Sequence, residues 1–174
     1  MNSPNNGRIA ILFCGQIRTG VKCYPSIAKF LDFWAEMGDI FIHTWDVDTI
    51  PPQGLLKRDP NLVNEKFPVP QSTFDKIKEL YNPVEMVVDK LEDFYKKPYN
   101  NVPWLYSFIQ VNEMRKRREQ DQYNGIPYMR VIKMRFDMLF DSNHSIEDEL
   151  KYMDQKEYVD FILADKSMGG LHKK

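Results

Sequence analysis

Short apolar runs alternate with amphipathic stretches along most of the chain. Residues 9–13, "IAILF", form a continuous apolar run, which is typical of a strand buried on both faces of a parallel sheet. From Ser26 to Met37 apolar side chains recur at helical spacing, and Gly38 is expected to end this helix. Residues 39–45, "DIFIHTW", are rich in β-branched and aromatic side chains and predict a second strand. This order of elements predicts a right-handed crossover between parallel strands.

The rest of the chain continues the alternation. Five prolines between residues 47 and 71 predict a long functional loop, and a second irregular stretch is expected over 90–103. The further predicted elements are a helix over 72–81, a strand over 84–89, a helix over 104–120, a strand over 129–134, a short acidic helix over 145–153 and a strand over 158–163. Alternating strands and helices predict an α/β protein with a three-layer α/β/α fold and a mainly parallel, Rossmann-like sheet, in one domain over residues 1–174.

Composition favours a folded, soluble protein. Apolar residues make up 43% of the 174 residues and aromatic residues 13%, which supplies a well-filled core and argues against disorder. The net charge of −1 gives no overall field that would attract nucleic acid or an anionic membrane. Cys14 and Cys23 make no disulfide framework, and no apolar run approaches the roughly 18 residues that span a bilayer. The sequence therefore predicts a cytoplasmic protein with no signal peptide, membrane span or nucleic-acid partner.

Polar side chains follow directly after the first predicted strand. Gly15 allows a sharp turn, and Gln16, Arg18 and Thr19 come next. Ligands of parallel α/β sheets bind beyond the carboxyl ends of the strands, where a guanidinium and a hydroxyl group can hold phosphate oxygens. The spacing matches neither a P-loop nor the three-glycine dinucleotide fingerprint. A phosphate or nucleotide site is one interpretation, and a strand-ending turn with a surface arginine is the other.

A second charged group ends the strand predicted at 129–134. Arg135 and Asp137 flank Phe136, and charged side chains that leave a buried strand must be matched or exposed to a ligand. Asp137 is a candidate ligand of a divalent cation, and Arg135 is a candidate partner of a diphosphate. The alternative interpretation is an internal ion pair between Arg135 and Asp137.

Three further motifs have simpler interpretations. Asp46 and Asp48 spell Asp-x-Asp after the second strand, but two such acids in a loop are more often solvated than bound to a metal. His43 is expected to be a hydrogen-bonded core residue of that strand. The basic run 115–118 is expected in the last turns of its helix, where positive charge complements the helix dipole.

Three stretches together resemble one family. "RIAILFCGQIRTG", "GDIFIHTWD" and "YMRVIKMRFDMLF" are similar to segments in the first half of nucleotide-sugar glycosyltransferases of the GT-A type. In those proteins a strand leads into Gly-Gln-x-Arg-Thr, a second strand ends in a Thr-Trp-Asp-like segment and a later strand ends in Arg-x-Asp. The stretch "WLYSFIQVNEMRK" also resembles the family's Tyr-Ser helix before that last strand.

The resemblance implies a GT-A-like nucleotide-binding half with a defined donor site. The residues implied to contact the donor nucleotide are Gly15, Gln16, Arg18 and Thr19. Asp137 stands where the metal-binding Asp-x-Asp motif of GT-A enzymes lies, which implies Mn²⁺ or Mg²⁺ as a cofactor. Arg135 replaces the first acid of that motif, so a guanidinium group takes over part of the cation's role at the diphosphate.

The function implied is transfer of a sugar from a nucleotide-diphosphate donor to a carbohydrate acceptor, as in polysaccharide biosynthesis. Such a transfer needs the growing charge of the diphosphate to be stabilised and the acceptor hydroxyl to be deprotonated. Candidates for the base are Asp46, Asp165 and His172. The alternatives are a non-catalytic nucleotide- or sugar-binding module derived from such an enzyme and a different nucleotide-dependent α/β enzyme.

Overall fold

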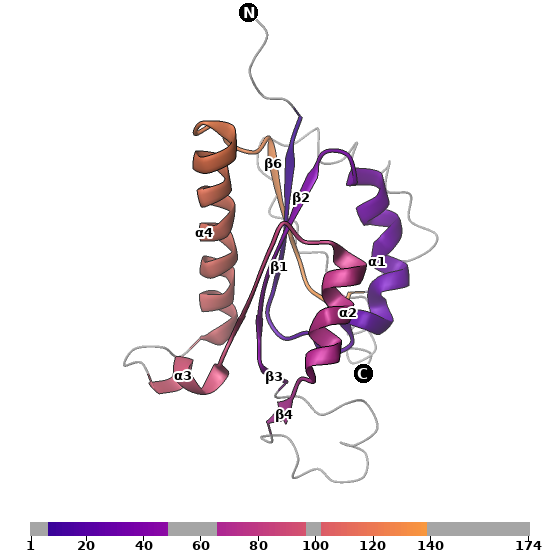
Figure 1. Cartoon of the computed structure of the whole chain (residues 1–174), viewed down its shortest axis with the longest axis vertical. Coiled ribbons are helices and arrows are strands. Elements are labelled where there is room, and N and C mark those ends of the chain that lie inside the picture. The colour runs from indigo at the N-terminus through magenta and orange to yellow at the C-terminus, as the bar shows by residue number, and fades with distance from the viewer. Residues whose placement is uncertain (1–6, 49–65, 97–101, 139–174) are drawn as a thin grey trace, which may run out of the picture.

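The structure is a computed structural model that describes residues 7–48, 66–96 and 102–138 (Figure 1). The elements, in chain order, are β1 (Ile9–Cys14), α1 (Gly20–Trp34), β2 (Gly38–Trp45), β3 (Val47–Asp48), β4 (Phe67–Pro68), α2 (Gln71–Tyr81), β5 (Glu85–Asp89), α3 (Leu91–Lys96), α4 (Pro103–Tyr123) and β6 (Arg130–Met134). The helix predicted at 145–153 and the strand predicted at 158–163 lie outside the described residues.

Four strands form one parallel sheet in the order β5-β2-β1-β6. β1 lies inside the sheet, and its Ile11 is in register with Ile40 of β2 and Ile132 of β6. Taken by their order along the chain, the four strands follow the arrangement 3-2-1-4 of a Rossmann half. β3 and β4 form a separate two-stranded antiparallel pair. The mainly parallel, Rossmann-like sheet predicted from the sequence is confirmed.

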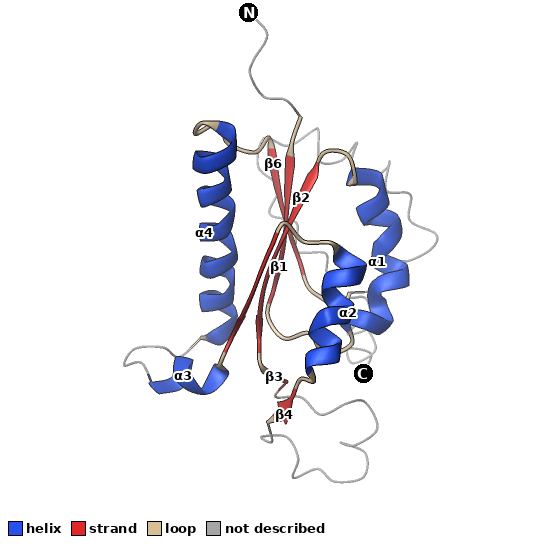
Figure 2. Ribbon diagram, viewed as in Figure 1, coloured by secondary structure: helices blue, strands red, loops and turns tan. Residues whose placement is uncertain are grey.

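Helices cover both faces of this sheet (Figures 1 and 2). Side chains of β1 alternate between the two faces because successive residues of a strand point in opposite directions. Ile9, Ile11 and Phe13 belong to the core beneath α1 and α2, whereas Ala10 and Leu12 pack with α4. The continuous apolar run at 9–13 therefore reflects burial on both faces, and the three-layer α/β/α fold is confirmed.

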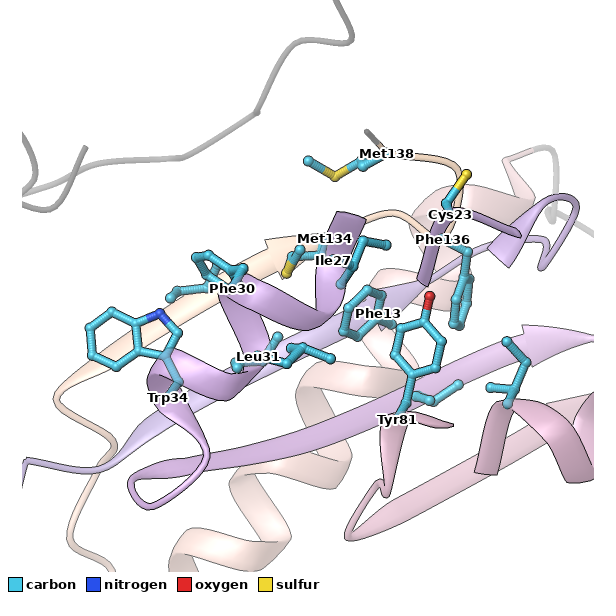
Figure 3. Close-up of a cluster of buried hydrophobic side chains, with 14 of the residues drawn as sticks. Phe13, Cys23, Ile27, Phe30, Leu31, Trp34, Tyr81, Met134, Phe136 and Met138 are labelled. Atoms are coloured by element: carbon cyan, nitrogen blue, oxygen red, sulfur yellow. The ribbon is translucent and has the colours of Figure 1, made fainter. Parts of the chain in front are cut away.

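An aromatic cluster ties the ends of several elements together (Figure 3). The ring of Phe13 lies 4.9 Å from that of Tyr81, at the end of α2, and 5.2 Å from that of Phe136, just after β6. The Tyr81 hydroxyl donates a hydrogen bond to the Gly20 carbonyl oxygen, at the start of α1. These contacts hold the carboxyl ends of β1 and β6 beside the first turn of α1.

α1 begins and ends earlier than the sequence pattern predicts. It starts at Gly20 rather than Ser26, and it includes Pro25, which has no backbone N–H group to donate within the helix. A Cβ atom at Gly20 would lie 3.0 Å from the Cβ of Phe136, so a glycine lets α1 start in close contact with the segment after β6. Gly38 does not end α1: it is the first residue of β2, where a Cβ would lie 2.9 Å from the Trp34 carbonyl oxygen.

Two irregular stretches contain short elements that the sequence did not predict. Within 90–103 lies α3, and at its start a carboxylate oxygen of Asp46 accepts a hydrogen bond from the Leu91 amide at 3.0 Å. This cap comes from a residue 45 positions earlier, so no local sequence pattern predicts it. Within 47–71, β3 and β4 pair, and α2 begins at Gln71.

The sequence pattern placed the basic run in the last turns of a helix that ends at residue 120. The helix α4 continues to Tyr123, so the run lies before its last turn. Its side chains instead pair with acids: Arg115 with Glu119, Lys116 with Glu113, Arg117 with Glu85 and Arg118 with Asp39. The run is therefore a set of ion pairs, of which the pair Arg115–Glu119 is largely buried. Among the helices of the described residues, none combines the length and the apolar character needed to cross a bilayer.

Candidate functional site

The order of the strands reverses between β1 and β6. From β1 the chain passes through α1 to β2 on one side, whereas α4 leads to β6 on the other side of β1. In open α/β sheets ligands bind outside the carboxyl ends of the strands at such a reversal. Two segments meet there: the β1–α1 segment, residues 15–19, and the β6 segment, residues 135–138.

The β1–α1 segment has an unusual backbone. Gly15 has φ +107°, and Arg18 has φ +47°, a left-handed conformation that costs a non-glycine residue about 1 to 3 kcal/mol. The Arg18 amide donates to both carboxylate oxygens of Asp48, at 3.1 and 3.3 Å, which holds this conformation. Ile17 is buried and anchors the segment in the core. A fixed backbone therefore presents the side chain of Arg18 at the end of β1.

The β6 segment alternates between core and surface. Phe136 is fully buried and stacks on Phe13, so its neighbours Arg135 and Asp137 point away from the core. The buried aromatic residue thereby brings both charged side chains to the same end of the sheet as Arg18.

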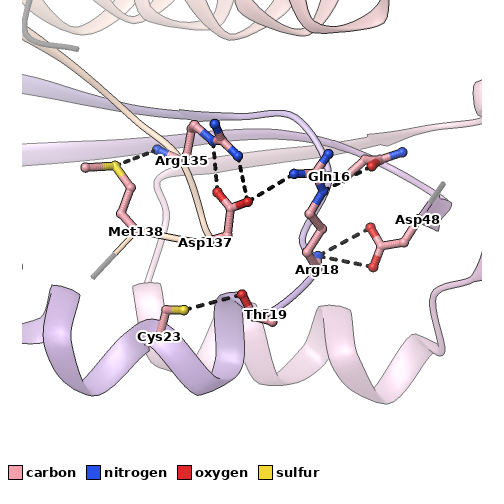
Figure 4. Close-up of polar contacts among 8 residues, drawn as sticks. All are labelled: Gln16, Arg18, Thr19, Cys23, Asp48, Arg135, Asp137 and Met138. Carbon is pink, nitrogen blue, oxygen red and sulfur yellow. Dashed lines mark hydrogen bonds and ion pairs between the residues drawn. The ribbon is translucent and has the colours of Figure 1, made fainter. Parts of the chain in front are cut away.

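Four of the residues predicted for the donor site form one network (Figure 4). Asp137 Oδ2 lies 3.0 Å from Arg18 Nη1 and 2.7 Å from Arg135 Nη2, and Asp137 Oδ1 accepts a hydrogen bond from Arg135 Nε at 2.9 Å. Arg18 Nε donates to Gln16 Oε1 at 3.3 Å. The ion pair between Arg135 and Asp137 considered from the sequence is present, and Arg18 joins it from a position 119 residues away in the chain.

The two acids of this region have opposite shifts. Burial raises the pKa of Asp48, and the amide and charge of Arg18 offset this only in part. Burial also acts on Asp137, but the hydrogen bonds and charges of Arg135 and Arg18 outweigh it and lower the pKa of that carboxyl group. Asp137 is therefore a stable anion between two guanidinium groups. The side chain of Arg135 remains 56% exposed, so solvent reaches it.

Gly15 and Thr19 make contacts within the protein. The Gly15 amide donates to the His43 carbonyl oxygen at 3.1 Å and to Ser107 Oγ at 2.9 Å, so it points into the protein. The Thr19 hydroxyl oxygen lies 3.4 Å from Cys23 Sγ, within α1 (Figure 4). Their contact with a donor nucleotide stays a prediction. The bonds described here do not connect the Gly15 amide or the Thr19 hydroxyl to the charged network.

The acids considered for a metal ion do not gather around one point. Asp46 caps α3, whereas Asp48 holds the Arg18 amide. Within the ranges 7–48, 66–96 and 102–138, no group of three or more His, Cys, Asp or Glu side chains comes together as a metal site would need. Asp137 already contacts two guanidinium groups. The role of Asp137 as a metal ligand stays a prediction.

A second, buried network contacts the first residue of the β1–α1 segment. His43 is fully buried and hydrogen-bonded, as expected for a core histidine: Nδ1 lies 2.7 Å from Ser107 Oγ and Nε2 lies 3.1 Å from Asp89 Oδ2. Ser107 belongs to the stretch that resembles the Tyr-Ser helix, but it was not predicted as a site residue, because it lies 64 residues from His43 and their contact depends on folding. Asp48 was considered only as half of an Asp-x-Asp motif, and its contact with Arg18 had no signal in the sequence.

Comparison of the chain with models of known protein families, with characterised proteins and with solved structures finds no match. The site is therefore interpreted from its own geometry and chemistry.

Proposed function

We propose that the protein binds a nucleotide-diphosphate sugar at the ends of β1 and β6 and transfers the sugar to a carbohydrate acceptor. One observation carries this proposal: Arg18 and Arg135 converge on Asp137 where the strand order reverses. Guanidinium groups match the oxygens of phosphates in charge and in geometry. The resemblance of the surrounding stretches to GT-A glycosyltransferases supports the same substrate class.

Asp137 prepares the two arginines for an incoming diphosphate. Without ligand, its carboxylate contacts both guanidinium groups, restricts their orientation and offsets one of their two positive charges. A diphosphate carries more negative charge and more acceptor oxygens than one carboxylate, so it competes for the same N–H groups. Because charge grows on the leaving diphosphate as the sugar departs, these contacts strengthen in the transition state and lower the barrier. In this proposal the positive charge comes from the protein's own side chains.

Asp48 is the residue that best suits the general base. A base must be ionised yet willing to accept a proton, and burial raises the pKa of Asp48 whereas that of Asp137 is lowered. Asp46 and Asp48 each accept a hydrogen bond from a backbone amide, that of Leu91 and that of Arg18, but Asp48 is the one that contacts the segment carrying Arg18; Asp165 and His172 lie outside the described residues. Asp48 would take the proton of the acceptor hydroxyl as the bond from that oxygen to the sugar forms and the bond to the diphosphate breaks.

Thermal unfolding with UDP-, GDP- and dTDP-sugars tests the proposal. A ligand present at 100 times its dissociation constant should stabilise the protein by about 2.7 kcal/mol. The same shift is expected in Mn²⁺ and in EDTA, because guanidinium groups supply the charge. A shift that disappears in EDTA would instead place a cation at Asp137. Binding without release of the nucleotide in the presence of acceptors would favour the non-catalytic module, and the absence of any shift would reject both.

Replacing Arg18 by alanine tests the residue on which the site depends most. Arg18→Ala is expected to weaken binding of the stabilising nucleotide sugar by about 10- to 100-fold, since a hydrogen bond to a charged group contributes about 1.5 to 3 kcal/mol. Titration calorimetry measures this change. Arg117→Ala is the matched control, because Arg117 forms an ion pair of its own with Glu85, the first residue of the edge strand β5, which β2 separates from β1. Equal affinities for Arg18→Ala and wild type would remove Arg18 from the site.

A further inference from the structure

The buried network of His43 and Ser107 is connected directly to the β1–α1 segment. Ser107 Oγ lies 2.7 Å from His43 Nδ1, 3.1 Å from the His43 carbonyl oxygen and 2.9 Å from the Gly15 amide nitrogen. Ser107 and His43 are both fully buried. Gly15 is the first residue after β1, so one hydroxyl group of α4 contacts both β2 and the start of the segment that carries Arg18.

The protons of this network can be assigned by counting donors and acceptors. The Asp89 carboxylate faces His43 Nε2 and can only accept, so Nε2 carries the proton and Nδ1 is the acceptor. The Ser107 hydroxyl has one proton and two acceptors within reach, Nδ1 at 2.7 Å and the His43 carbonyl oxygen at 3.1 Å; it donates to the nearer one, Nδ1, and its lone pairs remain for the Gly15 amide. The other titratable groups near His43 are Tyr106, whose hydroxyl donates to Asp89, and Cys14, its neighbour on β1. Burial lowers the pKa of His43, which favours this neutral state.

Fixing the Gly15 amide restricts everything that follows it. The amide is held from two elements at once, by the His43 carbonyl oxygen of β2 and by Ser107 of α4. Two residues later Ile17 is buried, and the Arg18 amide is held by Asp48. Because Gly15, Ile17 and the Arg18 amide are all held in place, the segment has little freedom to move Arg18 relative to Asp137.

We infer that Ser107 and His43 are positioning residues for diphosphate binding: they hold the Gly15 amide and thereby aim Gln16 and Arg18 at the ligand. This inference rests on the proposed function. Neither side chain touches the ligand, because both are buried behind the segment they hold. Removing the Ser107 hydroxyl keeps both arginine side chains in the protein but lets the backbone that carries Arg18 move.

Pyrophosphate is the probe for the test, because it carries the recognised group and does not depend on the identity of the base. Ser107→Ala is expected to bind pyrophosphate about three- to tenfold more weakly than wild type, the equivalent of one hydrogen bond. Tyr128→Phe is the matched control. It also removes one buried hydroxyl, which bonds to Asp39 near the start of β2, at the opposite end of the sheet. Its affinity for pyrophosphate is expected to equal that of wild type.

Hydrogen exchange of the Gly15 amide, followed by NMR, separates positioning from general loss of stability. The amide is expected to exchange faster in Ser107→Ala and at the wild-type rate in Tyr128→Phe. Ser107→Cys, with a group of similar size and weaker hydrogen bonds, serves if the alanine variant does not fold, and the same changes are expected in it. Pyrophosphate affinity or Gly15 exchange unchanged in the Ser107 variants would overturn the inference and leave the proposed function intact. A wild-type protein that binds no pyrophosphate would overturn both.

Discussion

At the scale of single residues, the order Arg135, Phe136, Asp137 explains why this site forms where it does. The aromatic ring is buried against Phe13, and the alternation of side chains then turns both charged groups to the surface. The sequence alone identified these charged residues and Arg18 as candidates, because charges at the ends of apolar runs need partners. It left open whether Asp137 pairs within the protein or binds a ligand. The contact between Asp137 and Arg18 depends on folding and has no counterpart in local sequence.

His43 gives the clearest prediction for pH dependence. Burial lowers its pKa in the folded protein below the ordinary value of 6.5, so the unfolded chain takes up the proton first as the pH falls. The stability that the neutral imidazole contributes is complete above pH 6.5 and is lost as the pH falls toward the folded-state pKa. Between pH 7 and 5, the free energy of unfolding of wild type is therefore expected to fall more steeply than that of His43→Gln.

Urea denaturation at a series of pH values measures both curves. The difference between the two proteins isolates His43, because every other titrating group is common to both. Parallel curves would mean that His43 has the same pKa folded and unfolded, and would contradict its burial in a neutral state.

At the scale of elements, the apolar patterns of β1, β2, α2, α4 and β6 predicted the observed elements to within a few residues. The misses have physical causes that lie outside each local stretch. α1 starts before Pro25 because Gly20 packs against Phe136, more than 100 residues later, and a carboxylate from the end of β2 caps the start of α3. Periodicity reports the burial of an element, whereas these boundaries are set by contacts between distant segments.

Gly20→Ala tests the close contact at the start of α1. Alanine favours a helix by up to about 1 kcal/mol, but overpacking against a buried ring typically costs about 1 to 3 kcal/mol. Because Phe136 is fully buried and stacked on Phe13, it has no room to move aside, and the cost of overpacking should exceed the gain in helix propensity. We expect a net loss of about 1 to 2 kcal/mol in urea denaturation.

Lys29→Ala, at an exposed position of the same helix, is the control and should change stability by less than about 0.5 kcal/mol. A Gly20→Ala variant as stable as wild type would show that α1 and the β6 segment are packed more loosely than described.

At the scale of the whole molecule, the strand order creates the site. The alternation of elements predicted a parallel sheet between helices. The order β5-β2-β1-β6 depends on which strands pair across long stretches of chain, and no local sequence pattern predicts this pairing. Only this order brings the residues after β1 beside those after β6. The GT-A resemblance and the reversal of strand order lead to the same edge of the sheet, and the proposed function depends on that agreement.

The most direct test of the central claim is a crystal structure of the protein soaked with the sugar nucleotide that gives the largest thermal shift. The account predicts density for the diphosphate at the ends of β1 and β6, with its oxygens within hydrogen-bond distance of Arg18 and Arg135. Density for the nucleotide elsewhere on the molecule, with Arg18 and Arg135 still paired to Asp137, would contradict it.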